Sequence, residues 1–224
     1  MNIICANKGA IAKVIVNRVA MSRPAIGEMR RAKMRDRLIA AGAKVIAELG
    51  SQKATIDDFV TEAKVSRGTF YNHFSTREQM LEAIWTSRGH APFTEILLAC
   101  RGIVDPAEHL SAVTRLVLRQ GMLDSTWGWL ILALSGDVST VNDDLREYPL
   151  PDLMAGQSAG IFHFDDVDCA ADMVVGSVRA GLHVLLTEKR ETHYVESMSK
   201  LLLLALGVVR DQAHRISHSP LNPT

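Results

Sequence analysis

The sequence predicts an all-α protein with two parts, a basic N-terminal unit of short helices and a longer helical body. Apolar residues recur at helical spacing through the 224-residue chain, and no stretch alternates with the period of a β-strand. With 47% hydrophobic residues, the chain is long enough to bury a sizeable core. The zero net charge hides a split: residues 1–90 carry 15 Lys and Arg against 8 Asp and Glu, and residues 91–224 carry 10 against 17. Such asymmetry indicates that the first half meets a polyanion.

The cysteines and the N-terminal residues indicate the cellular compartment of the protein. Three cysteines lie far apart, without the spacings of zinc sites or redox pairs, so we expect a reducing cytoplasm and neither a metal nor a cofactor. Lys8, Lys13 and Arg18 interrupt the apolar patches of residues 1–21. We therefore expect a soluble protein with no signal peptide and no contact with a membrane.

The first predicted helix follows a run of basic residues. Apolar or small residues fall at helical spacing at Leu38, Gly42, Val45 and Leu49, and Gly50 supplies a stop. The basic run that precedes this helix is either a solvated helix face or an arm that contacts DNA; it contains Arg30, Arg31, Lys33, Arg35 and Arg37.

Three short helices are predicted next, each with a hydroxyl side chain at its start. Thr55 precedes an apolar stripe that ends at Ala63, Ser66 caps a helix from Arg67 to about residue 74, and Thr76 opens a fourth. The spacing of Thr76 and Gln79 is that of a capping box.

The body beyond Pro92 is predicted to consist of further helices. Their expected ranges are 93–101, 106–124, 126–136, 138–147, 167–188 and 192–214. Proline and glycine between Tyr148 and Gly160 predict a long loop there. The expected organisation is an extension (1–31), a helix-turn-helix domain (32–92, motif 55–74), a regulatory and dimerisation domain (93–214) and a tail (215–224).

The strongest functional signal lies in residues 55–74, TIDDFVTEAKVSRGTFYNHF. Two short helices are separated by a tight turn, and the second has a narrow apolar edge formed by Phe70 and Phe74. Polar or small residues on the other faces would fit a helix that enters the major groove of DNA. A purely structural three-helix unit is the alternative interpretation.

The stretch TIDDFVTEAKVSRGTFYNHFSTREQML resembles the DNA-binding domain of TetR-family regulators, and the similarity extends over about residues 32–92. The resemblance implies that Thr55 lies near a phosphate, that the reading helix begins at Ser66, and that side chains around Arg77 approach the DNA backbone. The DNA-binding residues expected from the motif and the resemblance are Thr55, Ser66, Arg67, Gly68, Thr69, Tyr71, Asn72, His73, Thr76 and Arg77.

Two positions depart from the family pattern. Lys64 stands where the family commonly has glycine, and a left-handed conformation there is strained by about 1 kcal/mol. Val60 replaces the usual alanine, so helices 2 and 3 are expected to pack slightly farther apart.

The body contains candidates for a ligand cavity and for a metal site. Side chains that could line a cavity are Met122, Trp127, Trp129, Leu130, Tyr148 and Met154, although helical spacing fits plain core as well. His163 and three nearby aspartates could suggest a metal, but we expect Asp165 or Asp166 to cap the next helix instead.

The last two predicted helices are too apolar to be covered on one side only. In the resembled family they pair with their copies in a dimer as a four-helix bundle, and small residues would permit close approach. The expected interface residues are Gly176, Ala180, Gly181, Leu201, Leu204 and Val208. Burial of these residues within one subunit is the alternative.

The residues and the resemblance together predict a sequence-specific transcription regulator. The resemblance implies a homodimeric repressor of double-stranded operator DNA that a small apolar or amphipathic effector releases. The alternative is a ligand-independent dimeric DNA-binding protein or activator with the same N-terminal unit. We find no convincing catalytic arrangement in the sequence and therefore expect no enzymatic activity.

Overall fold

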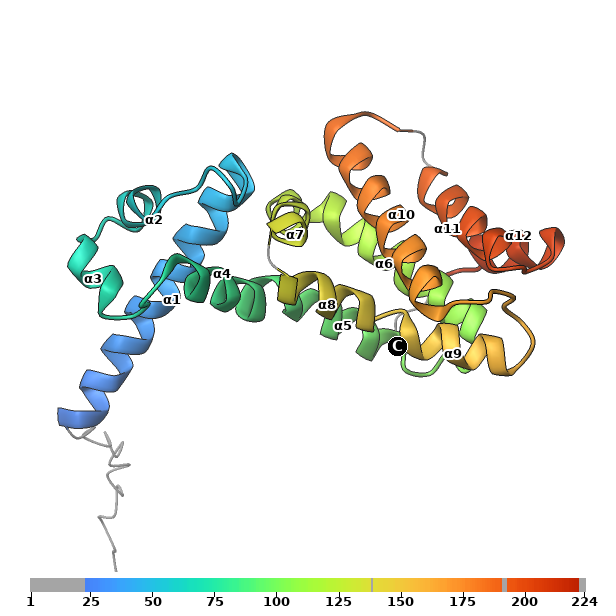
Figure 1. Ribbon diagram of the computed structural model, residues 1–224, viewed down its shortest axis with the longest axis horizontal. Coiled ribbons are helices and arrows are strands. Elements are labelled where there is room, and N and C mark those ends of the chain that lie inside the picture. The colour runs from blue at the N-terminus through green and yellow to red at the C-terminus, as the bar shows by residue number, and fades with distance from the viewer. Residues whose placement is uncertain (1–22, 138, 191–192, 222–224) are drawn as a thin grey trace, which may run out of the picture. The chain divides into compact units, whose positions relative to one another are not determined.

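The computed structural model describes residues 23–137, 139–190 and 193–221, and these are helical with no β-strand (Figure 1). The predicted all-α fold is therefore confirmed. Residues from Arg35 onward form one compact unit. The helices are α1 (Arg23–Leu49), α2 (Ile56–Ala63), α3 (Arg67–Tyr71), α4 (Arg77–Ile84), the π-helical turn η1 (Trp85–Gly89), α5 (His90–Cys100), α6 (Pro106–Leu123), α7 (Ser125–Asp137), α8 (Ser139–Glu147), α9 (Leu150–Ser158), α10 (Val167–Thr187), α11 (Tyr194–Ala205) and α12 (Arg210–His218).

The first helix is longer than the sequence predicted. It begins at Arg23, so the basic run forms turns of α1 and is not an arm that precedes it. Leu38 and Val45 are buried as expected, whereas Leu49 is exposed at the end of the helix. Gly50 ends α1 with φ of 80°, a left-handed conformation that favours glycine.

Several other boundaries also differ from the prediction. The helical path continues through Pro92, which lies inside α5, and residues 150–158 of the expected loop form α9. The expected single helix 192–214 is two helices, because Gly207 takes a φ of 95° between α11 and α12. Residues 215–218 of the expected tail belong to α12, where Ile216 is buried.

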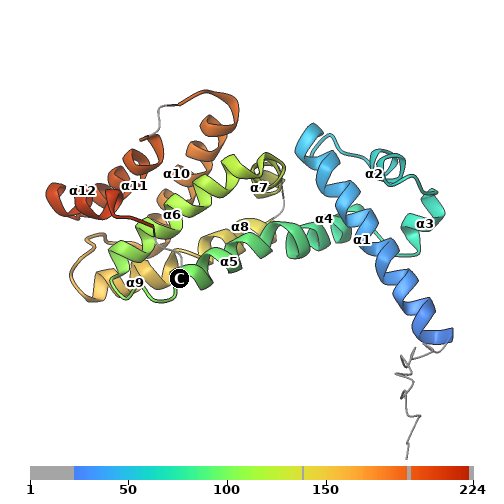
Figure 2. The ribbon, with the colours of Figure 1, turned by 180° about the vertical axis from the view of Figure 1, so that it is seen from behind.

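Two groups of buried side chains hold the described helices together. One extends from Leu38 in α1 through the aromatic residues of α2 to α5 and reaches Leu182 in α10. The other joins α6 and α9 to α12 around Phe162 and Leu203. Helices α10, α11 and α12 pack beside α6 (Figures 1 and 2).

Hydrogen bonds from two indoles anchor the connection that follows α4. Trp85 Nε1 donates to Asp144 Oδ2 of α8 at 2.5 Å, and Trp127 Nε1 of α7 donates to the carbonyl of Gly89 at 2.9 Å. A Cβ at Gly89 would lie 2.2 Å from the Trp85 ring, so the close packing requires glycine there. The turn η1 is therefore fastened to both α7 and α8.

Candidate functional site

The helices of the motif begin at the hydroxyl caps that the sequence predicted. Thr55 Oγ1 accepts from the backbone N–H of Asp58, whose carboxylate accepts from the backbone N–H of Thr55, which completes a capping box. Ser66 Oγ accepts from the N–H of Thr69 at 3.1 Å. Thr76 Oγ1 accepts from the N–H of Gln79, although the Gln79 side chain accepts from Ser75 and not from Thr76. Local sequence thus sets the starts of α2, α3 and α4.

The turn between α2 and α3 takes the strained conformation expected from the lysine in it. Lys64 has φ of 52° and ψ of 51°, and its N–H bonds back to the last turn of α2. Helix α3 spans only five residues and ends at Tyr71, three residues earlier than predicted. Phe70 and Phe74 are buried and anchor α3 and the turn after it.

The residues predicted to read DNA differ in how far their side chains are exposed to solvent. Gly68, Tyr71 and Asn72 are exposed, with 54% of Tyr71 accessible, whereas Thr69 and His73 are half-buried. A Cβ at Gly68 would meet only Ser66 Oγ, at an ordinary distance of 3.7 Å. No packing within the described chain therefore requires glycine at this position.

Arg67 makes an ion pair on the surface of the motif. Its Nε and Nη2 donate to the two carboxylate oxygens of Asp57, each at 2.5 Å. The hydrogen bond from Arg67 holds the pKa of Asp57 below its usual value. Both side chains are exposed, so the pair is screened by salt and a base or phosphate could replace Asp57.

Arg77, which was expected to approach DNA, instead faces the protein. Its Nε donates to the carbonyl of Ala54 at 2.9 Å, and its Nη2 donates to the carbonyl of Ser51. The side chain is mostly buried, and its only ion pair among the described residues is a long one to Glu78. The guanidinium thus supports the loop between α1 and α2. Contact of Arg77 with a DNA phosphate stays a prediction.

Arg77→Met is expected to lower the free energy of unfolding by about 1–3 kcal/mol, because two carbonyls lose a charged donor. Glu78→Ala is the control, since it removes the long ion pair and leaves those hydrogen bonds in place. Thermal unfolding of both variants measures the difference. Unchanged stability of Arg77→Met together with weaker DNA binding would show that Arg77 acts through the phosphate and not through the loop.

The basic run of α1 supplies exposed positive charge next to the motif in sequence. All five of its side chains are exposed. Arg35 also lies over the ring of Phe74, with 4.8 Å between the guanidinium carbon and the ring centroid. One cation of the run is therefore close to the residue that anchors the end of the motif.

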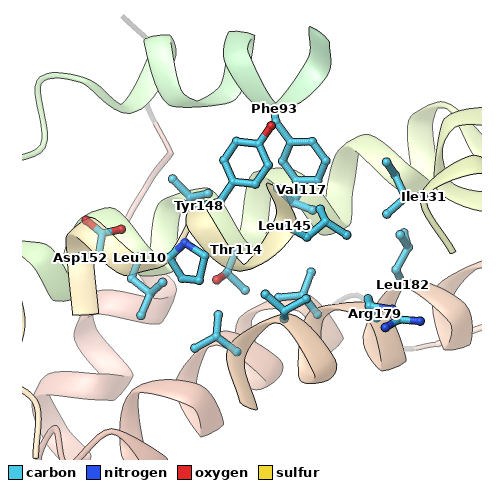
Figure 3. A pocket seen from close by; sticks show the side chains of 15 residues that line it. Phe93, Leu110, Thr114, Val117, Ile131, Leu145, Tyr148, Asp152, Arg179 and Leu182 are labelled. Atoms are coloured by element: carbon cyan, nitrogen blue, oxygen red, sulfur yellow. The ribbon is translucent and has the colours of Figure 1, made fainter. Parts of the chain in front are cut away.

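A cavity lies between α5, α6, α7, α8, the start of α9 and α10 (Figure 3). We call it the central cavity; its volume is about 60 Å³, taken as the space open to the centre of a water molecule. Most of the wall is apolar, and the rings of Phe93 and Tyr148 stack at 4.6 Å between centroids. The lining residues are Phe93, Leu110, Val113, Thr114, Val117, Ile131, Leu145, Tyr148, Pro149, Asp152, Val174, Val175, Val178, Arg179 and Leu182.

Of the six side chains proposed from the sequence to line a ligand cavity, only Tyr148 lines the central cavity. Trp127 and Leu130 belong to the core, and Met122 and Met154 are exposed. Trp129 lines a separate surface groove with residues 46–50. Phe93, Thr114 and Arg179 were not predicted to line a cavity, although Arg179 carried a signal as the one arginine within the apolar helix 167–187.

An ion pair between His109 and Asp152 borders the central cavity. His109 Nδ1 lies 2.7 Å from Asp152 Oδ2, and both side chains are largely buried. The hydrogen bond to Asp152 raises the pKa of His109 above its ordinary value of 6.5, against the opposing effect of burial. Burial likewise raises the pKa of Tyr148, whose hydroxyl lies 2.7 Å from His90 Nδ1.

Because the folded-state pKa of His109 is raised, the pair stabilises the fold fully below about pH 6.5 and loses this contribution as pH rises through the raised value. Unfolding midpoints should therefore fall more steeply toward alkaline pH in the wild type than in Asp152→Asn. His163→Gln, at an exposed histidine, serves as the control. Equal pH slopes for wild type and Asp152→Asn would contradict the role of the pair.

The residues expected at a dimer interface divide into two groups. Gly181 and Val208 are buried within the chain, and a Cβ at Gly181 would meet Leu118 and Met198 at 3.3 Å. Gly176, Ala180 and Leu201 are exposed, and Leu204 is half-buried. By length and composition alone, α10 is apolar enough to cross a membrane, a property shared by core helices, and 28% of its most apolar window is buried within the chain. An apolar face of α10 and α11 is thus left open.

The sequence matches two protein-family models. Residues 38–84 match the model described as bacterial regulatory proteins, tetR family, and residues 105–219 match the model described as tetracyclin repressor-like, C-terminal domain. A curated relative, an uncharacterized HTH-type transcriptional regulator YvdT of Bacillus subtilis (strain 168), is 39% identical over 49 residues. That match spans a quarter of the relative's length.

Solved structures are similar over most of the chain. RolR in complex with the ligand resorcinol is 25% identical, with a TM-score of 0.66, and the match covers 87% of this chain and 98% of that one. The fatty acid degradation regulator FadR from Bacillus halodurans is 24% identical with a TM-score of 0.62, covering 75% of this chain and 94% of that one, and shows likeness of fold.

Proposed function

Because the chain belongs to the TetR family of bacterial regulatory proteins, which are DNA-binding transcription regulators, we propose that it is a repressor released from its operator by a small molecule. The protein holds the operator as a homodimer, and the effector enters the central cavity. The matches point to regulation of transcription and not to an enzymatic reaction.

DNA is held by the N-terminal ends of α2 and α3 and by exposed cations of α1. Backbone N–H groups and hydroxyls at helix starts suit phosphate oxygens, and side chains on the exposed side of α3 reach base edges. Thr69 and Arg67 are the proposed base contacts, and Thr55, Tyr71 and His73 contact the backbone. Ser66, Asn72 and Thr76 position these groups through the turns that they cap.

A mobility-shift titration over a range of salt concentrations tests the DNA-binding surface. Affinity for duplex DNA should fall steeply as salt rises, because cations of α1 and α3 displace counterions from phosphates. Arg67→Ala and Thr69→Ala should change the order of preference among operator variants, each wrong base contact being worth about 1–3 kcal/mol. A uniform loss on every variant would limit these two residues to phosphate contact.

Dimerisation is proposed to use the open face of α10 and α11. Gly176 and Ala180 are one turn apart on α10, so another backbone can approach closely there, and Leu201 of α11 offers a large apolar side chain. A dyad places two copies of α3 on two half-sites of a palindromic operator.

The main observation in support of ligand control is that α8 connects the central cavity to the helix-turn-helix motif. Leu145 and Tyr148 line the cavity from α8 and the residue after it, and Asp144 of the same helix accepts the hydrogen bond from Trp85. Trp85 directly follows α4, which itself follows the reading helix. A ligand that displaces α8 therefore acts on η1 and α4, provided that it binds the DNA-incompetent arrangement more tightly.

Calorimetry of one ligand with free and operator-bound protein tests this control. Linkage requires operator DNA to weaken ligand binding by the factor by which ligand weakens operator binding. Val113→Phe should fill part of the central cavity and abolish the response, whereas Val104→Phe, at a fully exposed valine, should not. Equal ligand affinities with and without operator would contradict ligand control.

The volume of the cavity favours a second candidate, a ligand-independent DNA-binding protein or activator with the same N-terminal unit. A void of about 150 Å³ holds a benzene ring, so a cavity of about 60 Å³ has to widen before a one-ring ligand fits. The similar protein RolR, solved with resorcinol bound, supports the ligand-controlled alternative.

A further inference from the structure

We propose that the effector is an amphipathic carboxylate, a small molecule with an apolar ring or chain whose anionic end pairs with Arg179. The inference rests on the proposed function, since it names the class of molecule that the central cavity takes.

Arg179 brings an uncompensated positive charge to an otherwise apolar wall. It lies on α10 among Val174, Val175, Val178 and Leu182, which all line the central cavity. Its guanidinium makes no ion pair or hydrogen bond with any described residue, and its Nε is buried without a partner. The residue is half-buried, and its buried Nε has lost hydration without gaining an acceptor. A carboxylate in the cavity would supply that acceptor and a counter-charge.

Thr114 supplies a second polar group from a neighbouring helix. The residue is 4% exposed, lies on α6, and lines the central cavity. Its side chain makes no hydrogen bond within the part of the chain that the structure describes. A hydroxyl in the cavity wall that makes no other hydrogen bond can donate to or accept from a ligand.

The one carboxylate of the lining does not neutralise Arg179. Asp152 is engaged by His109, whose raised pKa favours the protonated imidazole. In Figure 3, Asp152 and Arg179 lie at opposite ends of the labelled lining, with Thr114 between them. The polar groups of the cavity wall that are left for a ligand are therefore the guanidinium of Arg179 and the hydroxyl of Thr114.

The chemistry of these groups favours a carboxylate over other ligands. One planar guanidinium matches one carboxylate through two parallel hydrogen bonds, and apolar walls accept the rest of the molecule. A neutral ligand would bury Arg179 further without a counter-charge. A phosphate dianion would bring two charges to a single cation.

Calorimetry with the full chain and three pairs of probes tests the inference. The pairs are benzoate and benzyl alcohol, 3-phenylpropionate and 3-phenylpropan-1-ol, and octanoate and 1-octanol. At least one acid should bind about tenfold or more tightly than its alcohol, as expected for a charge-assisted pair. Arg179→Met should reduce the affinity of that acid to that of its alcohol and leave the alcohol unaffected, and Arg179→Lys should retain part of the preference.

Two controls separate ligand recognition from folding. Arg101→Met, which removes an exposed arginine elsewhere, should leave all affinities unchanged. Without ligand, Arg179→Met should be at least as stable as the wild type, because it removes a charge that has no partner. A large loss of stability would show that Arg179 has a structural partner, such as an acid of the other subunit, and would overturn the inference.

The remaining outcomes distinguish the inference from the proposed function. Alcohols that bind as tightly as acids, an Arg179→Met variant that keeps its preference for acids, or no binding by any probe would each overturn the inference. An acid that binds through Arg179 but leaves operator affinity unchanged would support the inference and contradict ligand control.

Discussion

Leu201→Glu is expected to convert the protein to monomers and to lower its operator affinity by about a hundredfold or more, because two linked half-sites are no longer bound together. In the isolated chain 62% of Leu201 is exposed, so glutamate should be tolerated in the folded subunit. In the proposed dimer the same charge would be buried without a partner. Light scattering and a mobility-shift titration on the same sample measure the two effects.

Leu98→Glu is the matched control for this variant. Leu98 is 56% exposed on α5, away from the proposed dimer face in sequence and fold. The Leu98→Glu variant should remain dimeric and bind the operator with wild-type affinity. A dimeric Leu201→Glu variant with full affinity would move the interface to another surface.

Gly68→Ala is expected to affect folding and DNA binding in opposite directions. Alanine at a helical position is favoured over glycine by about 0.5–1 kcal/mol, and the space around Gly68 accepts a methyl group. Against DNA the same methyl group would hold α3 away from the groove and lower affinity by about tenfold or more. Unfolding midpoint and operator affinity are measured together.

Gly102→Ala is the control, because a methyl group at this glycine also fits without a clash. A Cβ at Gly102 would meet nothing within 4 Å, and the residue lies in the turn before α6. The operator affinity of the Gly102→Ala variant should match that of the wild type. A Gly68→Ala variant that binds operator normally would show that DNA does not approach α3 closely at this residue.

The short helices of the motif were predictable because their signals are local. Thr55, Ser66 and Asp166 each cap a helix through bonds to residues two or three positions away, so their spacing in the sequence is sufficient. The left-handed conformation of Lys64 was expected from the resemblance, because the family commonly has glycine at this position.

The helix through Pro92 could not be predicted from proline alone. The carbonyl that a helical proline would crowd is that of Arg88, four residues earlier, and it lies within η1, where hydrogen bonding follows the wider π pattern. Similarly, α9 begins between Pro149 and Pro151, because proline is tolerated in the first turn of a helix. In both cases proline marks a local change within helical structure and not a loop.

The cavity depends on tertiary packing and was therefore missed. Its walls come from residues up to 89 positions apart, from Phe93 to Leu182, and helical periodicity does not tell which helices face one another. Trp127 was expected to line a cavity, yet its indole is held in the core by the carbonyl of Gly89. The hydrogen bonds of Arg77 could not be predicted either, because the carbonyls of Ser51 and Ala54 that accept them are more than 20 residues away in the chain.

Selection of duplexes from a random DNA library by the full chain tests the central claim most directly. The proposed dimer of a sequence-specific regulator should enrich an inverted repeat whose half-site centres lie about one helical turn, or a multiple of one, apart. The same library selected with Gly68→Ala should lose this enrichment, while selection with Gly102→Ala should reproduce it. Recovery of unrelated duplexes without a common repeat, by a folded protein, would contradict sequence-specific operator binding.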